Sequence, residues 1–299
     1  FTSGFQSVNS DIRVQLAFNK NDWKLNQELD EDIFDISPSV SGKVVALSNN
    51  TIAFIPKKKL DQNTLYQITL DLTKITNVPK EELQKFNFSF KTIKQDFTVT
   101  TEDLQSYSQD YYYQYGKLKT ADDLDFDEAK KLIEATQNGD DLKIIFDKAA
   151  STKTEFKFMI DSIQRFDATS EVELKWDGDA ADIDDQEGET TIEIPGKNNF
   201  KVLSVKIGDE NNQSLLINFS DRLKKDQDFK GLVNIENTDN LKFATMGNVL
   251  KVFFDNTRPE DKQQIQQATP VETAVVDSTI AVVDSVTVAV DTAAVAVDE

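Results

Sequence analysis

The sequence predicts an all-β protein built from tandem antiparallel β-sandwich domains, with one short helix in its second block. Three observations support this prediction. Apolar residues make up 38% of the chain, and 20 of them are Phe. Apolar and polar residues alternate in short runs, as in strands with one buried face. Turn-forming residues separate these runs at intervals of about ten residues, a spacing typical of sandwiches.

The first block, residues 1–94, contains the clearest alternation. Ile12, Val14, Leu16 and Phe18 are separated by single polar or small residues, which predicts a half-buried strand over 12–18. Further strands are predicted at 42–47, 51–56, 65–72 and 86–92. Asn-containing and Asp-containing turns follow two of the runs. This block is therefore interpreted as a β-sandwich domain.

The second block, residues 95–199, combines strands with one predicted helix at 126–137. Asp125 and Glu128 have the spacing of a capping box at its start, and Gly139 lies just beyond its end. Ala129, Leu132, Ile133 and Thr136 would form its apolar face. Strands are predicted at 142–146, 154–163, 172–176 and 191–194.

The third block, residues 200–255, repeats part of the first. In both, a strand ending in Phe is followed by a charged connection and then by three strands with Asn-rich turns. The third block has no counterpart of the last two strands of the first. We therefore expect an incomplete third domain, which is either truncated or has its sheet completed by another segment.

Residues 256–299 form a linker and a low-complexity Val/Ala/Asp tail. Asp277, Asp284, Asp291 and Asp298 recur at intervals of seven. The abundance of Val and Thr and the lack of Leu argue against a coiled coil. Two alternatives remain, an extended tether and a strand added to an open sheet edge.

The composition excludes several classes of function. Without His or Cys, the chain contains no Ser-His-Asp or Cys-His catalytic group, no zinc site built from those residues and no disulfide. A net charge of −20 argues against binding to nucleic acid. The chain contains no run of about 20 apolar residues, so the sequence predicts no transmembrane helix. We expect no enzymatic activity and no cofactor, and we interpret the start at Phe1 as a processed segment whose targeting information has been removed.

An acidic run is the only cluster with the potential to ligate a metal. Its weak candidates for Ca²⁺ ligands are Asp177, Asp179, Asp182 and Asp184. The Gly and Glu of an EF-hand loop are not at the required positions. A solvated hairpin tip is the simpler interpretation, so we expect no metal site.

Tyrosines gather at the start of the second block. In a strand, Tyr111, Tyr113 and Tyr115 would share one face and either cover a neighbouring domain or hold a ligand. Trp23 and Trp176 are expected to be core or rim anchors. The basic turn at 57–59 is expected to be a solvated group of charges.

Several segments resemble the amino-terminal part of bacterial α2-macroglobulin-like proteins, in particular the large forms of Bacteroidetes. The most specific are WDG at Trp176 to Gly178 and the pattern FSD-x-L, Q-D and GLV from Phe219 to Val233. The first block resembles a bacterial Ig-like module with Pro38 and Gly42 in its pattern. The resemblance covers residues 1–255 and implies macroglobulin-type sandwich domains.

The resemblance also implies a function, because members of this family trap proteases after cleavage of a bait segment, often with a thioester formed by Cys. This chain has no Cys and no identifiable bait, so no functional residue is transferred. We expect a non-catalytic scaffold that meets proteases through a longer parent chain and contacts other domains of that chain. The expected location is the periplasm or cell surface, with anchoring to the outer membrane through a removed lipid anchor.

Two other functions remain open. One is a surface Ig-like adhesion or ligand-binding lipoprotein, a partner of an outer-membrane complex. The other is a carboxylate-dependent enzyme such as a glycosidase, for which the sequence offers no positive feature.

Overall fold

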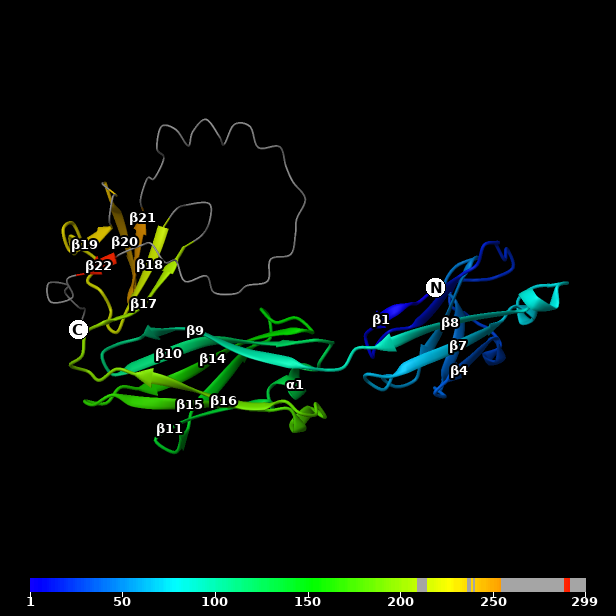
Figure 1. Ribbon diagram of the computed structural model, residues 1–299, viewed down its shortest axis with the longest axis horizontal. Coiled ribbons are helices and arrows are strands. Elements are labelled where there is room, and N and C mark those ends of the chain that lie inside the picture. Colours follow the sequence, from blue (N-terminus) through cyan, green and yellow to red (C-terminus); the bar gives the residue numbers. More distant parts are fainter. Residues whose placement is uncertain (209–213, 236–237, 239, 254–287, 291–299) are drawn as a thin grey trace.

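The computed structural model describes residues 1–208, 214–235, 238, 240–253 and 288–290. The described chain is all-β with very little helix, as predicted. Its strands form three successive modules, each with its own cluster of buried apolar side chains. Figure 1 shows the first two modules end to end and the third beside the far end of the second. No helix among these residues has the length and apolar character needed to cross a membrane.

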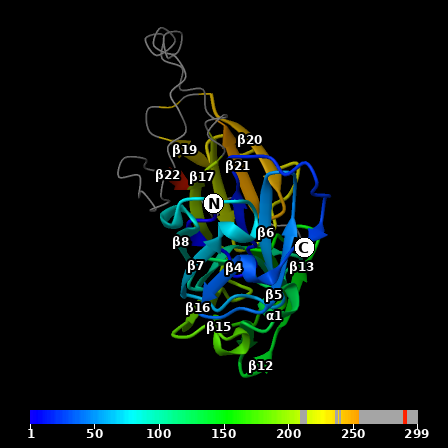
Figure 2. The ribbon, with the colours of Figure 1, turned by 90° about the vertical axis from the view of Figure 1, so that its right-hand side faces the viewer.

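The first module consists of two four-stranded sheets, with the orders β1-β8-β7-β4 and β2-β6-β5-β3. Its strands are β1 (Gly4–Gln6), β2 (Ile12–Gln15), β3 (Gln27–Glu28), β4 (Phe34–Ser37), β5 (Gly42–Ala46), β6 (Thr51–Pro56), β7 (Leu65–Asp71) and β8 (Lys85–Thr92). Three 3₁₀ turns, η1 (Glu31–Ile33), η2 (Leu72–Lys74) and η3 (Glu81–Leu83), connect them. Ile12, Val14 and Leu16 are buried as their alternation predicts, whereas Phe18 lies beyond the strand and is exposed. Figure 2 views the row of modules from the side of this first module.

The second module has the largest core and again two four-stranded sheets, β13-β14-β10-β9 and β12-β11-β15-β16. Its strands are β9 (Phe97–Ser106), β10 (Tyr111–Thr120), β11 (Ile133–Gln137), β12 (Asp140–Asp141), β13 (Lys143–Asp147), β14 (Glu155–Gln164), β15 (Ser170–Asp177) and β16 (Glu187–Ile194). Its helices are α1 (Phe126–Ala129) and the 3₁₀ turn η4 (Asp179–Ala181).

The predicted helix at 126–137 is wrong beyond its first four residues. The capping box of Asp125 and Glu128 is present, but α1 ends at Ala129. From Ile133 the chain forms β11, in which alternate residues are buried and which pairs with β15. Four residues of helix leave little cooperative stability. The strand instead buries apolar side chains between two sheets, and this tertiary packing overrides the helical pattern.

The third module is smaller. Its strands are β17 (Val202–Ile207), β18 (Ser214–Phe219), β19 (Val233–Ile235), β20 (Lys242–Met246), β21 (Val249–Phe253) and β22 (Val288–Val290). The order β17-β18-β21-β20 makes one sheet, and β19 and β22 make a second, two-stranded one. Because β22 belongs to the tail, the alternative of a strand added to an open edge holds for Val288–Val290. The rest of the tail lies outside the described residues.

A close approach between two strands fixes the centre of the second module. Gly116 on β10 lies opposite Phe158 on β14, and the Phe158 ring fills the space that a side chain at position 116 would need. A Cβ atom there would lie 2.2 Å from the ring carbon Cζ. Phe158 is itself buried in the core, so the ring has little room to move.

Gly116→Ala is therefore expected to destabilise the chain, although alanine ordinarily suits a strand better than glycine. Overpacking predicts a loss of about 1–3 kcal/mol in the free energy of unfolding, measured by urea denaturation. Phe158→Leu should lower the free energy of unfolding less in the Gly116→Ala variant than in the wild-type chain. Strictly additive losses would contradict the proposed contact.

Candidate functional site

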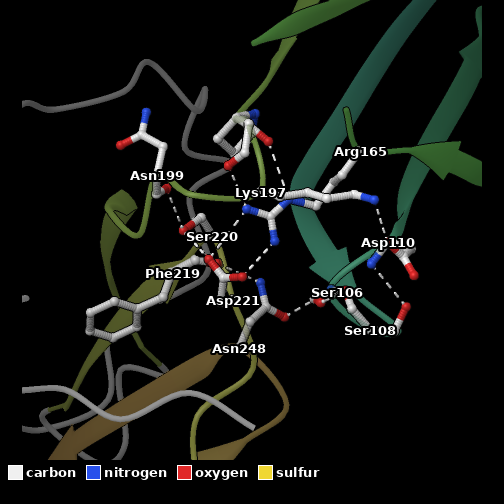
Figure 3. A network of polar contacts seen from close by, with 12 residues as sticks. Ser106, Ser108, Asp110, Arg165, Lys197, Asn199, Phe219, Ser220, Asp221 and Asn248 are labelled. Atoms are coloured by element: carbon white, nitrogen blue, oxygen red, sulfur yellow. Dashed lines mark hydrogen bonds and ion pairs between the residues drawn. The ribbon is translucent and has the colours of Figure 1, made fainter. Parts of the chain in front are cut away.

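The most elaborate polar arrangement in the described residues lies where the second and third modules meet. Its central residues each follow the end of a strand: Arg165 comes directly after β14, and Ser220 and Asp221 come after β18. The Arg165 side chain is completely buried, and Nη1 lies 2.5 Å from Oδ1 of Asp221. Figure 3 shows this pair and the contacts around it. We call this group of contacts the 2–3 joint.

Arg165 is surrounded by acceptors. Its Nε donates to the carbonyl oxygen of Pro195 at 3.2 Å, and its Nη2 donates to that of Gly196 at 2.8 Å. Asp221 also accepts a hydrogen bond of 2.6 Å from the Ser220 hydroxyl. Burying two charges costs several kcal/mol per ion unless the remaining donors and acceptors are satisfied. Here the hydrogen bonds supply that compensation, so each partner depends on the other.

Tyr112 connects this ion pair to β10. Its ring lies 5.0 Å from the guanidinium carbon of Arg165, within the range of a cation–π contact. Its hydroxyl donates to the carbonyl oxygen of Ser220. Burial raises the pKa of Tyr112 well above its usual value, and the Asp221 carboxylate adds to the rise while Arg165 opposes it.

A second part of the 2–3 joint is built by two asparagines. Asn248 lies in the turn between β20 and β21 and is almost fully buried. Its Nδ2 donates to the carbonyl oxygens of Leu104 at 3.0 Å and Phe219 at 2.8 Å, and its Oδ1 accepts the backbone N–H of Ser106 at 3.1 Å. Asn218 donates to the same Leu104 oxygen at 3.0 Å. The β20–β21 turn and strand β18 of the third module are thus hydrogen-bonded to the end of β9.

Exposed contacts surround this buried centre. Lys197 lies 2.5 Å from Asp110, and this hydrogen bond raises the pKa of the Lys197 ammonium group. Lys206 lies 2.8 Å from Asp103, and Arg222 donates to the Tyr107 carbonyl oxygen at 3.1 Å. Such exposed pairs contribute little individually. The stability of the 2–3 joint therefore depends on its buried part.

The joint between the first and second modules is different, because most of its polar contacts are exposed. Lys59 lies 3.0 Å from Asp125, and Lys94 lies 3.8 Å from Asp185. One exception is Asp122, which is nearly buried and accepts the N–H of Val8 at 2.8 Å. No ion pair among the described residues of this joint is buried as Arg165 and Asp221 are. We therefore expect the first joint to bend more easily than the second.

The acidic run lies at this first joint. Asp177 accepts the N–H of Asp179 at 2.9 Å and so stabilises its own turn, while the Asp182 carbonyl accepts a hydrogen bond of 2.9 Å from Gln62 of the first module. Among the described residues, no group of three or more potential ligands is placed to hold a metal ion. The weak candidates Asp177, Asp179, Asp182 and Asp184 stay a sequence-based prediction.

The tyrosine cluster lies on the outer face of the second module. Tyr113 is central: its ring lies 4.5 Å from that of Tyr107 and 5.4 Å from that of Tyr115. The Tyr107 hydroxyl donates to Asp161 at 2.6 Å. Burial of the hydroxyl and this hydrogen bond raise the pKa of Tyr107 to about 12. We call Tyr107, Tyr113 and Tyr115 the tyrosine face.

The tryptophans and the basic turn occupy the expected kinds of position. Trp23 and Trp176 are half-buried against the cores of the first and second modules. Trp176 lies over Gly188, where an added Cβ would come within 2.6 Å of the ring. Trp176 also lines an open hollow of about 610 Å³, together with charged side chains of both signs. Lys57 and Lys58 are exposed.

Sequence reasoning missed the residues of the 2–3 joint. Arg165 follows an alternating strand and looks like an ordinary surface charge, and Tyr112 lies among other tyrosines in the sequence. The one available signal was the FSD segment, since Asp221 belongs to the pattern that carries the family resemblance. Its contact with Arg165 spans two modules, so no local spacing reveals it.

Comparisons with known proteins give only weak matches to solved structures. No family model and no curated protein matches the chain. Domains 4–9 of the surface layer protein SbsC match at a TM-score of 0.27 and 13% identity, over 78% of this chain and 36% of that one. A chimeric titin Z1Z2 tandem matches at a TM-score of 0.22 and 10% identity, over 65% of this chain and 94% of that one. The mouse nectin-like molecule 4 ectodomain matches at a TM-score of 0.27 and 9% identity, over 84% of this chain and 86% of that one. TM-scores this low carry no information about function, and the fold assignment rests on the strand pairing described above.

Breaking the buried ion pair is expected to be costly. Arg165→Met leaves the Asp221 carboxylate buried without a partner, which predicts a loss of about 3–5 kcal/mol in the free energy of unfolding. The double variant Arg165→Met/Asp221→Leu should recover much of that loss. Denaturant titration followed by circular dichroism measures both. Lys206→Met, which breaks an exposed pair, is the control and should cost less than about 1 kcal/mol. A single variant no worse than this control would refute the role of the pair.

Alkali is expected to weaken the 2–3 joint. Unfolded tyrosine ionises near pH 10, at about its ordinary pKa. Because burial raises the pKa of Tyr112, the native state keeps its proton when the unfolded state has lost it. The free energy of unfolding should therefore be unaffected below about pH 10 and should fall as the pH rises above it. Urea titrations between about pH 8 and pH 11 measure this slope. Tyr112→Phe should make this slope shallower and leave the part that Tyr107 contributes, whereas Tyr111→Phe, an exposed neighbour, should not.

Proposed function

We propose that this chain is the non-catalytic amino-terminal scaffold of an exported, α2-macroglobulin-like protease-trapping protein. The observation that carries the proposal is the place of the family-like FSD segment in the fold. Ser220 and Asp221 of this segment supply the acceptors for Tyr112 and for Nη1 of Arg165 in the 2–3 joint. One of the two most specific parts of the resemblance thus contains residues that join modules.

The WDG segment supports the same interpretation. An added Cβ at Gly178 would lie 2.3 Å from the carbonyl oxygen of Ile183, so the turn requires glycine. Trp176 packs against the core of the second module. These residues build the module, and no reaction needs to be assigned to them.

A trapping protein needs a frame that keeps its shape while another part is cut. The second and third modules suit this role, because the 2–3 joint is buried and its polar groups are hydrogen-bonded. The more exposed first joint supplies a place where the frame can bend. In this proposal the partners are proteases, which the parent protein captures, and neighbouring domains of the same chain. The proposed location is the periplasm or the cell surface, with a lipid anchor.

The test uses the polypeptide that carries this chain, isolated from its native source. After limited cleavage by a broad-specificity protease, the complex should become more compact in small-angle scattering. The captured protease should still cleave a small chromogenic peptide but lose activity on a large protein substrate. The 299-residue chain alone should neither hydrolyse these substrates nor inhibit the protease. Absence of both compaction and shielding in the native polypeptide would refute the proposal.

The tyrosine face favours a second candidate, a surface adhesion or ligand-binding protein. Tyr107 and Tyr115 are both more than 40% exposed, and both rings contact Tyr113. Aromatic rings of this kind suit stacking on a ligand. If the native polypeptide shields no protease but binds glycans, and Tyr115→Ala removes that binding while Leu65→Ala does not, this second function replaces the first.

A further inference from the structure

The second sheet of the third module is formed by strands that are far apart in the chain. β19 and β22 pair antiparallel, with Val233 opposite Val290, Asn234 opposite Ala289 and Ile235 opposite Val288. Residues 254–287 lie between β22 and the end of β21. Figure 1 shows β22 beside β19, at the outer side of the third module. The tail therefore reaches back to complete the module.

β19 depends on this added strand. Val233 is buried with Phe229 and Leu250 in the core of the third module, which fixes β19 at its place. In the described part of the chain, β22 is the only strand that pairs with β19. Without a partner strand, the backbone N–H and C=O groups along the edge of β19 can pair with any extended segment. β19 is thus an acceptor edge, and its occupant in this structure is a Val-Ala-Val strand.

The tail contains more than one such donor sequence. The tetrapeptide Val-Ala-Val-Asp occurs at 288–291 and again, unchanged, at 295–298. Strand addition depends on main-chain hydrogen bonds and on alternating side chains, and both copies meet these requirements equally. A single β19 takes one strand. The chain therefore carries a spare donor sequence.

We propose that β19 is an intermolecular docking edge whose partner is the Val-Ala-Val strand of a second copy of this chain. The strand pair is the same whether β22 comes from its own chain or from another, so exchange between copies is a low-cost route to assembly. The tethered strand competes at an effective concentration on the order of millimolar. Dilute chains therefore remain closed, and crowded chains exchange strands. Each copy carries a charge of −20, so salt should favour the linked form.

The experiment removes the intramolecular competition with two complementary variants of the full chain. The acceptor variant keeps β19 but carries Val288→Pro, Ala289→Pro, Val295→Pro and Ala296→Pro, which removes strand N–H groups from both donor sequences. The donor variant keeps the tail but carries Asn234→Pro in β19, at an exposed position. Each should sediment as a monomer in analytical ultracentrifugation. Their mixture, at about 10–500 μM, should form a 1:1 complex whose fraction rises with concentration and salt.

Two further measurements identify the contact. Amide hydrogen exchange at 233–235 should be fast in the acceptor variant alone and at least tenfold slower in the mixture. A control chain with Gln263→Pro and Gln264→Pro, in the polar linker, should behave as the wild type. Should Asn234→Pro prevent folding, as judged by circular dichroism, Ile235→Pro replaces it.

Several results would overturn the proposal. One is a mixture that stays monomeric across the concentration range. Another is a complex that forms without slower exchange at 233–235, because the contact would then lie elsewhere. Association of the acceptor variant with itself would have the same consequence. None of these results bears on protease trapping, since the 2–3 joint is unchanged in every variant.

Discussion

The buried pair of Arg165 and Asp221 is the interaction on which the arrangement of the second and third modules depends. Arg165 alone would be an uncompensated charge in the second module, and Asp221 alone would be one in the third. Each module thus contains a group that is satisfied only when the other module is in place. Tyr112 and Asn248 extend the same dependence to β10 and β9. The joint is therefore specific as well as stable.

Much of the fold follows from local pattern, because alternation reports which face of a strand is buried. Ile12 and Val14, or Phe156 and Phe158, are buried as their spacing predicts. The helix prediction failed where two patterns overlap: Leu132 and Ile133 fit a helical face, but Ile133 and Ala135 also fit a strand. The strand prevails because β15 offers a partner that no local rule can include.

The candidate site was far less predictable than the fold. The 2–3 joint is made by residues from separate modules, and Arg165 lies more than fifty positions before Asp221. Charged residues usually lie at the protein surface, so the sequence gives no reason to expect a buried arginine. The tail was predictable in part, since its Val-Ala-Val alternation allowed a strand while its partner β19 is known only from the structure.

The order of the modules along the chain has a consequence for biosynthesis. A ribosome delivers Tyr112, Arg165 and the end of β9 before it delivers Asp221 and Asn248. The second module has the largest core, and the fully buried residues of that core all precede the third module. The small third module then folds against the second and supplies the partner of Arg165, in the order expected when domains emerge from the amino terminus first. Its last strand comes from the far end of the chain, so the nascent third module keeps β19 open until translation reaches the tail.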